Sequence, residues 1–393
     1  MKLFLNECAI VCALGDNHGA IKRALFGGES GIAPTEAWSA GRALPLGCVD
    51  SVLPDAASLP LTERSRNNQL ALAALAQIRP AVDAAIARHG AHRIGIVIGT
   101  STSGVAETES ALREHAASGT LPPEFHYAQQ EMVSPALMLA RELGVTGPAY
   151  VHSAACASGA KAMASAARMI RMGLCDVVLC GGADSLCAFT VAGFGALESV
   201  SAQRCNPLGA NRNGINIGEG AALFLMSTEP AAVALCGWGE ASDGHHMSAP
   251  DPAGSGARIA IAEALARAGI AATDIDYINL HGTATIQNDA MESRVVADLF
   301  GADVAVSSTK SLTGHALGAA AALEAAFCWL AMQDDNHEGQ LPAHVWDGVP
   351  DPALPTLKLV APHTRLGRPL NWALSNSFAF GGSNAALVLG RTQ

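Results

Sequence analysis

Short apolar runs alternate with longer stretches of helix-forming residues along most of the chain. Runs of strand length occur at 94–99, 149–151, 176–180, 221–226, 232–238, 275–280, 304–308, 371–375 and 384–389. Helical stretches occur at 65–89, 105–117, 134–143, 160–172, 257–268, 289–299 and 316–332, and we expect a break or kink in the first at Pro80. Apolar strands that alternate with helices are typical of sheets covered on both faces. The pattern predicts an α/β fold with largely parallel sheets.

Four chemically useful side chains follow the ends of predicted strands. They are Cys156, His281, Lys310 and Asn376. In open α/β sheets, ligands bind outside the carboxyl ends of the strands. We therefore expect these positions to converge on one site, although they span more than half of the chain.

Cys156 lies in a turn between a predicted strand and a predicted helix. Its neighbours from Ser153 to Gly159 are all alanine, serine or glycine. A nucleophile on such a turn stands uncrowded at the head of a helix. The unpaired N–H groups and positive dipole end of that helix predict a preference for the thiolate. The alternative is a small buried cysteine in a packed turn.

Composition narrows the classes of function. The chain has 393 residues, 50% hydrophobic and 15% charged, and its formal net charge of −11 disfavours a nucleic-acid surface. Ten cysteines lack paired spacing, so neither a disulfide framework nor a zinc site is indicated. A metal site built on His245, His246, His281 and His315 fits no common spacing. No apolar run approaches the ~20 residues of a membrane span and no signal peptide is recognisable, so we expect a cytoplasmic protein.

Three further stretches, taken with the cysteine turn, point to a family. They are 279–285 (NLHGTAT), 307–318 (SSTKSLTGHALG) and 376–384 (NSFAFGGSN). In combination and order they closely resemble the β-ketoacyl-acyl carrier protein synthases of fatty-acid and polyketide assembly, in the elongating Cys-His-His branch. The resemblance covers essentially the whole chain. It implies a dimer whose chains have a thiolase-like, five-layered α/β/α/β/α fold. The fold would consist of two similar halves. Residues 1–229 would carry the cysteine, and residues 230–393 would carry the histidines and a gating loop.

The resemblance implies a role for each residue of the reaction centre. Cys156 accepts the acyl chain from an acyl carrier protein as a thioester. His281 and His315 hydrogen-bond the thioester oxygen of the incoming malonyl unit, beside Lys310 and above the buried Glu324. Two neutral imidazoles there would stabilise the enolate that forms when CO2 leaves. The lysine would disfavour their protonation by like-charge repulsion.

The resemblance also assigns residues to binding and gating. Thr283 and Thr285 contact the phosphopantetheine arm, and Phe378 and Phe380 lie in a glycine-hinged gate. The backbone N–H groups of Cys156 and Phe380 form an oxyanion hole. No cofactor or metal is implied, because the substrates arrive on the phosphopantetheine of the carrier protein. The resemblance places the docking surface for that acidic protein at Arg64, Arg66 and Arg204. The alternative is that these three are ordinary solvated arginines.

Three positions depart from the commoner family pattern. Ala154 stands where threonine is frequent, Ala379 replaces a glycine between the gate phenylalanines, and 286–289 replaces a proline-containing run. Glycine tolerates dihedral angles that alanine does not. The sequence therefore does not establish whether a gate with Ala379 moves as the family's gate does. The chain is similar to condensing subunits of aryl-polyene type II polyketide clusters. Some of these pair with a chain-length-factor-like subunit, so homodimer and heterodimer both stay open.

Three alternatives were weighed against an elongating synthase. A degradative thiolase carries a second catalytic cysteine near the C-terminal glycine turn, and no cysteine lies beyond Cys328. An initiating synthase of the Cys-His-Asn type would lack the lysine and histidine of 307–318, although Asn376 and Asn384 keep it open. A non-elongating, chain-length-determining or structural partner subunit typically lacks the nucleophile that Cys156 supplies.

Overall fold

The computed structural model describes residues 1–392 of the 393. The strands are β1 (Phe4–Cys12), β2 (Ala33–Thr35), β3 (Leu44–Leu46), β4 (Ile94–Gly99), β5 (Ala149–His152), β6 (Val177–Asp184), β7 (Gly220–Ser227), β8 (Val233–Ser242), β9 (Tyr277–Asn279), β10 (Ala305–Ser307), β11 (Lys358–Leu359), β12 (Trp372–Ala379) and β13 (Ser383–Arg391). β2 and β3 pair separately, and the others run in the order β11-β10-β9-β12-β13-β8-β1-β7-β6-β4-β5. Strands from before and after residue 229 meet only where Phe4 pairs with Ala234. The division into halves 1–229 and 230–393 itself stays a prediction.

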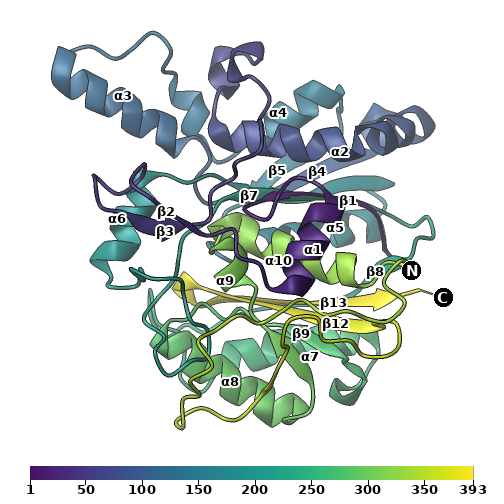
Figure 1. Ribbon diagram of the computed structural model, residues 1–393. Coiled ribbons are helices and arrows are strands. Elements are labelled where there is room, and N and C mark those ends of the chain that lie inside the picture. The colour runs from purple at the N-terminus through teal and green to yellow at the C-terminus, as the bar shows by residue number, and fades with distance from the viewer. Residues whose placement is uncertain (393) are drawn as a thin grey trace.

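Helices cover both outer faces of this strand arrangement and fill the space between its two parts (Figure 1). The α-helices are α1 (His18–Gly27), α2 (Arg66–His89), α3 (Val105–Ser118), α4 (Ser134–Leu143), α5 (Ser158–Arg171), α6 (Ala188–Ala196), α7 (Ser255–Ala268), α8 (Ile286–Phe300), α9 (Lys310–Thr313) and α10 (Ala320–Ala331). Short 3₁₀ helices span Ala56–Ser58, Leu61–Glu63, Ala91–Arg93, Tyr127–Gln130, Ala272–Asp274, Leu317–Ala319 and Phe380–Gly382. From top to bottom, the layers are α2 with α4, the β4–β7 strands, α5 with α10, the β12–β13 strands, and α7 with α8. The five-layered, thiolase-like α/β fold is confirmed.

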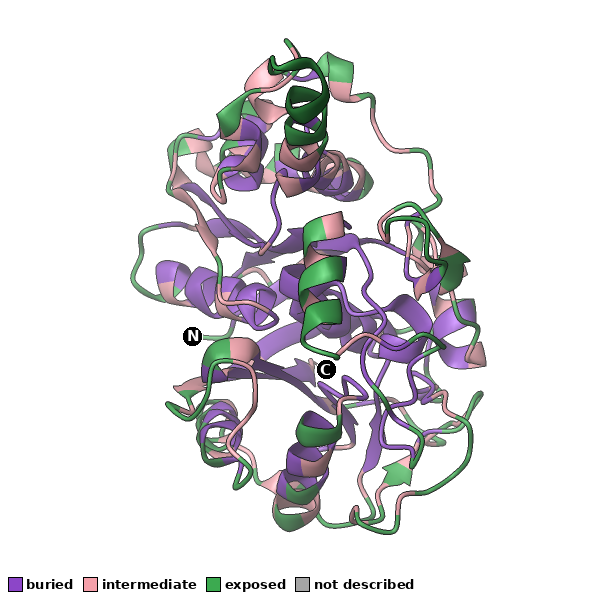
Figure 2. Ribbon diagram, turned by 90° about the vertical axis from the view of Figure 1, so that its left-hand side faces the viewer, coloured by how far each residue is buried: buried purple, intermediate pink, exposed green. Residues whose placement is uncertain are grey.

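The central helical layer is the most deeply buried part of the molecule (Figure 2). All twelve residues of α10 are buried, as its apolar sequence predicts, although residues 317–319 form a 3₁₀ turn before it. α5 approaches α10 and β4 so closely that side chains cannot fit between them. A Cβ at Gly159 would lie 2.8 Å from the Ala322 nitrogen, and one at Gly99 would lie 2.4 Å from the Ser158 carbonyl carbon. These glycines therefore fix the start of α5, next to Cys156.

The expectation of largely parallel sheets was wrong, because the large sheet is mixed. β4, β5 and β6 pair in parallel, as do β9 to β12, whereas β6–β7, β1–β7, β12–β13 and β8–β13 are antiparallel. Antiparallel neighbours need no crossover helix, and only a short turn at 380–382 joins β12 to β13. The apolar runs revealed burial on both faces but not strand direction.

The predicted break at Pro80 does not occur, because α2 runs unbroken from Arg66 to His89, and the alternative of a kink there stays a prediction. Pro80 and Ala76, whose carbonyl loses its partner, are both exposed, so water can satisfy that carbonyl. The opposite face packs Leu70, Leu75 and similar residues against the sheet. Within residues 1–392, this helix alone is long and apolar enough to span a membrane by length and composition. It lies in an outer layer of the fold, where one apolar face packs on the sheet and 33% of its most apolar window is buried.

Candidate active site

Cys156 stands on a strained turn between β5 and α5. The residue before it, Ala155, has a φ of 47°, a left-handed conformation that costs an L-residue about 1–2 kcal/mol. The hydroxyl of Ser158 stabilises the turn by donating to the Ala155 carbonyl at 2.6 Å and accepting from the Ala154 N–H at 2.8 Å. The thiol side chain is only 5% exposed. The sulfur is thereby fixed in front of the first turn of α5.

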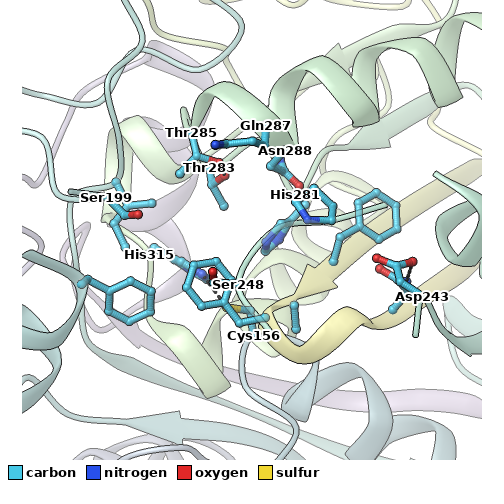
Figure 3. A pocket seen from close by; sticks show the side chains of 17 residues that line it. Cys156, Ser199, Asp243, Ser248, His281, Thr283, Thr285, Gln287, Asn288 and His315 are labelled. Atoms are coloured by element: carbon cyan, nitrogen blue, oxygen red, sulfur yellow. Dashed lines mark hydrogen bonds between the residues drawn. The ribbon is translucent and has the colours of Figure 1, made fainter. Parts of the chain in front are cut away.

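Two imidazoles point toward this thiol (Figure 3). Nε2 of His315 lies 2.9 Å from Sγ of Cys156. A ring nitrogen of His281 joins them, since one such atom from each of the three residues lies within 4.8 Å of the others. The two imidazole centroids are 5.4 Å apart, with the rings nearly perpendicular. Three predicted residues from the two ends of the chain thus meet in one place.

A buried carboxylate holds the turn that carries His281. The N–H groups of His281 and Gly282 donate to Glu292 at 2.8 and 2.7 Å. The amide of Asn376 donates to the same carboxylate at 3.2 Å. Asn376 therefore lies inside β12 and supports the histidine turn, instead of following a strand end as we expected.

Backbone pairing and a second buried carboxylate hold the turn that carries His315. The His315 N–H donates to the Asn216 carbonyl at 2.7 Å. Three residues later, the Gly318 N–H donates to Asp184 at 2.6 Å. Asp184 also accepts hydrogen bonds from backbone and hydroxyl groups of residues 100–102. The ends of β4 and β6 are thereby tied to the catalytic histidine segment.

The resting state of Cys156 is the thiol. Burial raises the pKa of this thiol to about 12, although the Lys310 charge and the backbone N–H groups of Cys156 and Phe380 lower it. The expectation that the helix N-terminus yields a thiolate was therefore wrong, because desolvation outweighs it. A base must take the proton as the sulfur attacks. His315 is within hydrogen-bond reach of it.

Both imidazoles are neutral at physiological pH. Burial lowers the pKa of His281 and of His315 well below the ordinary value, and the Lys310 charge lowers both further. This agrees with the like-charge repulsion expected from the sequence. Neutral imidazoles can accept a proton or donate an N–H hydrogen bond, which is what acyl chemistry needs here.

Lys310 begins α9 and forms an ion pair with Glu324 of α10. The side chains are 2% and 4% exposed. Burial raises the pKa of Glu324, while its contact with Lys310 lowers it. The lysine thus lies in the reaction centre, as the resemblance implies, and the carboxylate of Glu324 compensates its charge.

Replacing Lys310 with methionine should lower the free energy of unfolding by about 3–5 kcal/mol, because Glu324 is then buried without a partner. The double variant Lys310→Met/Glu324→Leu should recover most of that loss. Urea unfolding of the three proteins measures both effects. A single variant as stable as the wild type would show that this pair does not stabilise the centre.

The gate residues close over the histidines without backbone strain. Ala379 has φ −99° and ψ 157°, an extended conformation open to any residue, so its replacement of glycine costs nothing in this state. The centroids of Phe378 and His281 are 6.2 Å apart, and those of Phe380 and Phe194 of α6 are 5.4 Å apart. The backbone N–H groups of Cys156 and Phe380 both face the sulfur, as an oxyanion hole requires.

A cavity of about 50 Å³ lies over the thiol, and polar side chains surround its mouth. Thr283 and Thr285 line it, with their hydroxyl oxygens 2.9 Å apart. Figure 3 shows both threonines on the same side of the cavity as Gln287. The predicted phosphopantetheine contacts therefore stand at the cavity with the catalytic residues. Gln287 belongs to the 286–289 departure and has no role assigned by the resemblance.

The three predicted docking arginines lie in different surroundings. Arg66 donates to both carboxylate oxygens of the buried Glu219, at 2.8 and 2.5 Å. Arg64 donates to the Leu59 carbonyl at 2.9 Å, and both arginines line a separate pocket. Arg204 is exposed on the 198–215 loop, which contributes lining residues to the cavity over the thiol. Of the three, Arg204 alone lies on a segment that contributes to the cavity lining.

Sequence reasoning missed His344, because an isolated histidine in the 334–369 loop has no motif around it. Its ring is buried, with Nδ1 accepting from the Ser308 N–H at 3.1 Å and Nε2 donating to the Pro207 carbonyl at 3.1 Å. These bonds connect the segment before Lys310 to the loop that carries Arg204. Burial lowers the pKa of His344 to about 4, while the Pro207 carbonyl raises it.

The stability difference between wild type and His344→Gln should depend on pH. Below about pH 6.5 the unfolded imidazole binds a proton that the folded one excludes, so the wild type loses this stability as the pH falls towards 4. A fall in pKa from 6.5 to about 4 corresponds to about 3 kcal/mol. Urea unfolding of both proteins at about pH 7 and about pH 4.5 gives the difference directly. A difference independent of pH would refute the neutral, buried state of His344.

Comparisons with known proteins agree with this geometry. Residues 8–232 match the family model "Beta-ketoacyl synthase, N-terminal domain", and residues 232–344 match "Beta-ketoacyl synthase, C-terminal domain". The 3-oxoacyl-[acyl-carrier-protein] synthase 2 of Rhizobium meliloti is 39% identical over 264 residues, 62% of this chain and 61% of that protein. Nodulation protein E of a Rhizobium species is 32% identical over 394 residues, 96% of each chain.

Solved structures agree over the full length. A ketosynthase of Xenorhabdus doucetiae, solved in complex with its chain length factor, superposes with a TM-score of 0.93 at 44% identity, covering 100% of this chain and 98% of that one. The ishigamide ketosynthase/chain length factor gives 0.87 at 27% identity, with 100% and 99% covered. The chain therefore belongs to the beta-ketoacyl synthase family of acyltransferases and is a ketosynthase.

Proposed function

We propose that this ketosynthase elongates acyl chains by two carbons, taking the acyl group onto Cys156 and condensing it with a malonyl unit on an acyl carrier protein. The observation that carries the proposal is the convergence of one thiol and two neutral imidazoles within 4.8 Å, in a cavity whose backbone N–H groups face the sulfur. A non-elongating partner subunit would have no use for a nucleophile in this setting.

In acyl transfer, Sγ of Cys156 attacks the carbonyl of the incoming thioester. Nε2 of His315, at 2.9 Å, takes the thiol proton and passes it to the departing phosphopantetheine sulfur, so both groups end neutral. The N–H groups of Cys156 and Phe380 stabilise the oxyanion that forms between these events. The product is a thioester on Cys156 and a free carrier thiol.

In condensation, the malonyl thioester loses CO2 and the resulting enolate attacks the acyl carbonyl on Cys156. The charge of the enolate develops on the thioester oxygen, where His281 and His315 donate N–H hydrogen bonds. His315 uses here the tautomer with hydrogen on Nε2, and acyl transfer uses the other one. Burial, and to a smaller extent the charge of Lys310, lowers the pKa of each ring and keeps both neutral. The backbone oxyanion hole serves again as Cys156 leaves as a thiolate, and the uptake of one proton from solvent restores the thiol.

We propose further that the working form is the ketosynthase half of a heterodimer with a chain-length-factor-like subunit, in an aryl-polyene type pathway. The Xenorhabdus relative with its chain length factor supports this. The ten free cysteines fit the reducing conditions of the cytoplasm, and the proposed chemistry uses carrier-bound substrates without a cofactor.

The test is a condensation assay with a medium-chain acyl carrier protein and malonyl carrier protein. The chain purified with a chain-length-factor-like partner should release CO2 and form the carrier-bound β-ketoacyl product. The chain purified alone should form less product, because the proposed working form is the pair. A pair that binds both carriers but forms no product would reject the elongating function.

Charge reversal at Arg204 should weaken the use of carrier-bound substrate. An exposed arginine on the 198–215 loop would attract an acidic carrier, and Arg204→Glu replaces that attraction with repulsion. We expect kcat/KM to fall about tenfold for the acyl carrier protein and to stay unchanged for a small thioester mimic. Arg42→Glu, another exposed arginine outside the cavity lining, is the matched control. Equal losses with both substrates would count against docking.

A further inference from the structure

The reaction centre has the donor set of a transition-metal site. Sγ of Cys156 and one ring nitrogen each of His281 and His315 lie within 4.8 Å of one another, and all three side chains are buried. Tetrahedral zinc binds sulfur at about 2.3 Å and nitrogen at about 2.0–2.1 Å, which places neighbouring donor atoms about 3.4–3.6 Å apart. The 2.9 Å between Sγ of Cys156 and Nε2 of His315 is shorter than this, so these two side chains have to move apart when a metal binds. The exposed pair His245 and His246, weighed from the sequence, is not part of this group.

The ion pair beside the donors limits the repulsion that a bound cation would meet. The Lys310 charge would oppose a cation, but Glu324 compensates it at ion-pair distance. The cavity of about 50 Å³ next to the donors has room for the water that completes four-coordination.

We infer that Cys156, His281 and His315 bind one borderline-soft divalent cation such as Zn²⁺, which blocks the enzyme reversibly by capping the thiol. On binding, the Cys156 S–H bond breaks, a sulfur–metal bond forms, and the proton leaves to solvent. Metal and acyl group exclude each other, because a thioester sulfur is no longer a thiolate donor. Acylated enzyme should therefore resist the metal. The inhibitory consequence rests on the proposed function, whereas metal binding itself does not.

The experiment uses Co²⁺ as a spectroscopic probe on metal-free protein, followed by displacement with Zn²⁺. Wild type should bind one cobalt per chain, with a thiolate-to-cobalt charge-transfer band and the visible bands of a four-coordinate site. Cys156→Ala should lose the charge-transfer band, and His281→Ala and His315→Ala should each bind at least about tenfold more weakly. Cys236→Ala, which removes another partly accessible thiol, is the matched control and should bind as wild type does.

Two outcomes would overturn the inference. One is a charge-transfer band that persists in Cys156→Ala, and the other is wild-type cobalt binding no stronger than that of His281→Ala and His315→Ala. Unchanged melting temperatures of the variants ensure that lost binding is not lost folding. Failure of the proposed function would give a different result. If the protein binds metal through Cys156 but is never acylated, the metal site stands and the proposed ketosynthase mechanism is wrong.

Discussion

Cys156→Ala should lower the rate of condensation by at least about 10⁴-fold while the protein stays folded. Removing the nucleophile of an acyl-transfer centre typically has an effect of this size or larger. Here Sγ is the one thiol at the cavity, and it stands 2.9 Å from the base that takes its proton. The assay is product formation from acyl and malonyl carrier proteins, with the melting temperature recorded for each variant.

The matched control is Cys187→Ala, which removes another buried thiol that lies outside the cavity lining. It should retain most of the wild-type rate. If Cys156→Ala keeps more than about one hundredth of the wild-type rate, covalent catalysis through this residue is excluded. A large loss of the condensation rate in both variants would indicate that the substitutions disturb the packing of the protein and not the catalytic step.

The two histidines should differ in which half-reaction they support. His281→Ala should lower malonyl decarboxylation about 10²–10³-fold, the usual loss of one oxyanion donor, and leave acyl transfer within a few-fold. His315→Ala should lower both half-reactions, because only His315 is hydrogen-bonded to the thiol. Quenched-flow mass analysis measures acyl transfer, and CO2 release measures decarboxylation.

His18→Ala provides the control, since that histidine bonds to the Cys8 carbonyl and lies outside the cavity. It should leave both half-reactions unchanged. Equal losses of acyl transfer in His281→Ala and His315→Ala would contradict the assigned roles. If replacing Lys310 alone lowers acyl transfer as much as His315→Ala does, the loss would point to a change in the protonation of the imidazoles.

The residues of the reaction centre could be predicted from sequence because four short stretches, in combination and order, resemble the motifs of a known family. Cys156, His281, Lys310 and His315 were named from such stretches, and the structure brings them together. The neutral state of both imidazoles agreed with the sequence prediction, whereas the protonation state of the thiol did not. The local helix N-terminus predicted a thiolate, but burial by distant segments raises the pKa of Cys156 to about 12.

The sequence did not reveal which distant segments hold the turns of the reaction centre in place. His344 and Asp184 hold the turns that carry Lys310 and His315, yet each acts through partners far away in the chain. Strand direction was missed for a similar reason, since an apolar run reports burial on both faces and not the neighbour it pairs with. The pairing of Arg66 with the buried Glu219 was missed as well, because the two residues lie far apart in the chain, and its role in docking stays a prediction.

The central claim is that Cys156 accepts the acyl chain, and intact-protein mass tests it most directly. The chain with its partner subunit is incubated with medium-chain acyl carrier proteins, using wild type and Cys156→Ala. We predict one acyl adduct per ketosynthase chain on the wild type and none on the variant. An adduct that persists on Cys156→Ala, or its absence from the wild type with every starter length, would contradict the account.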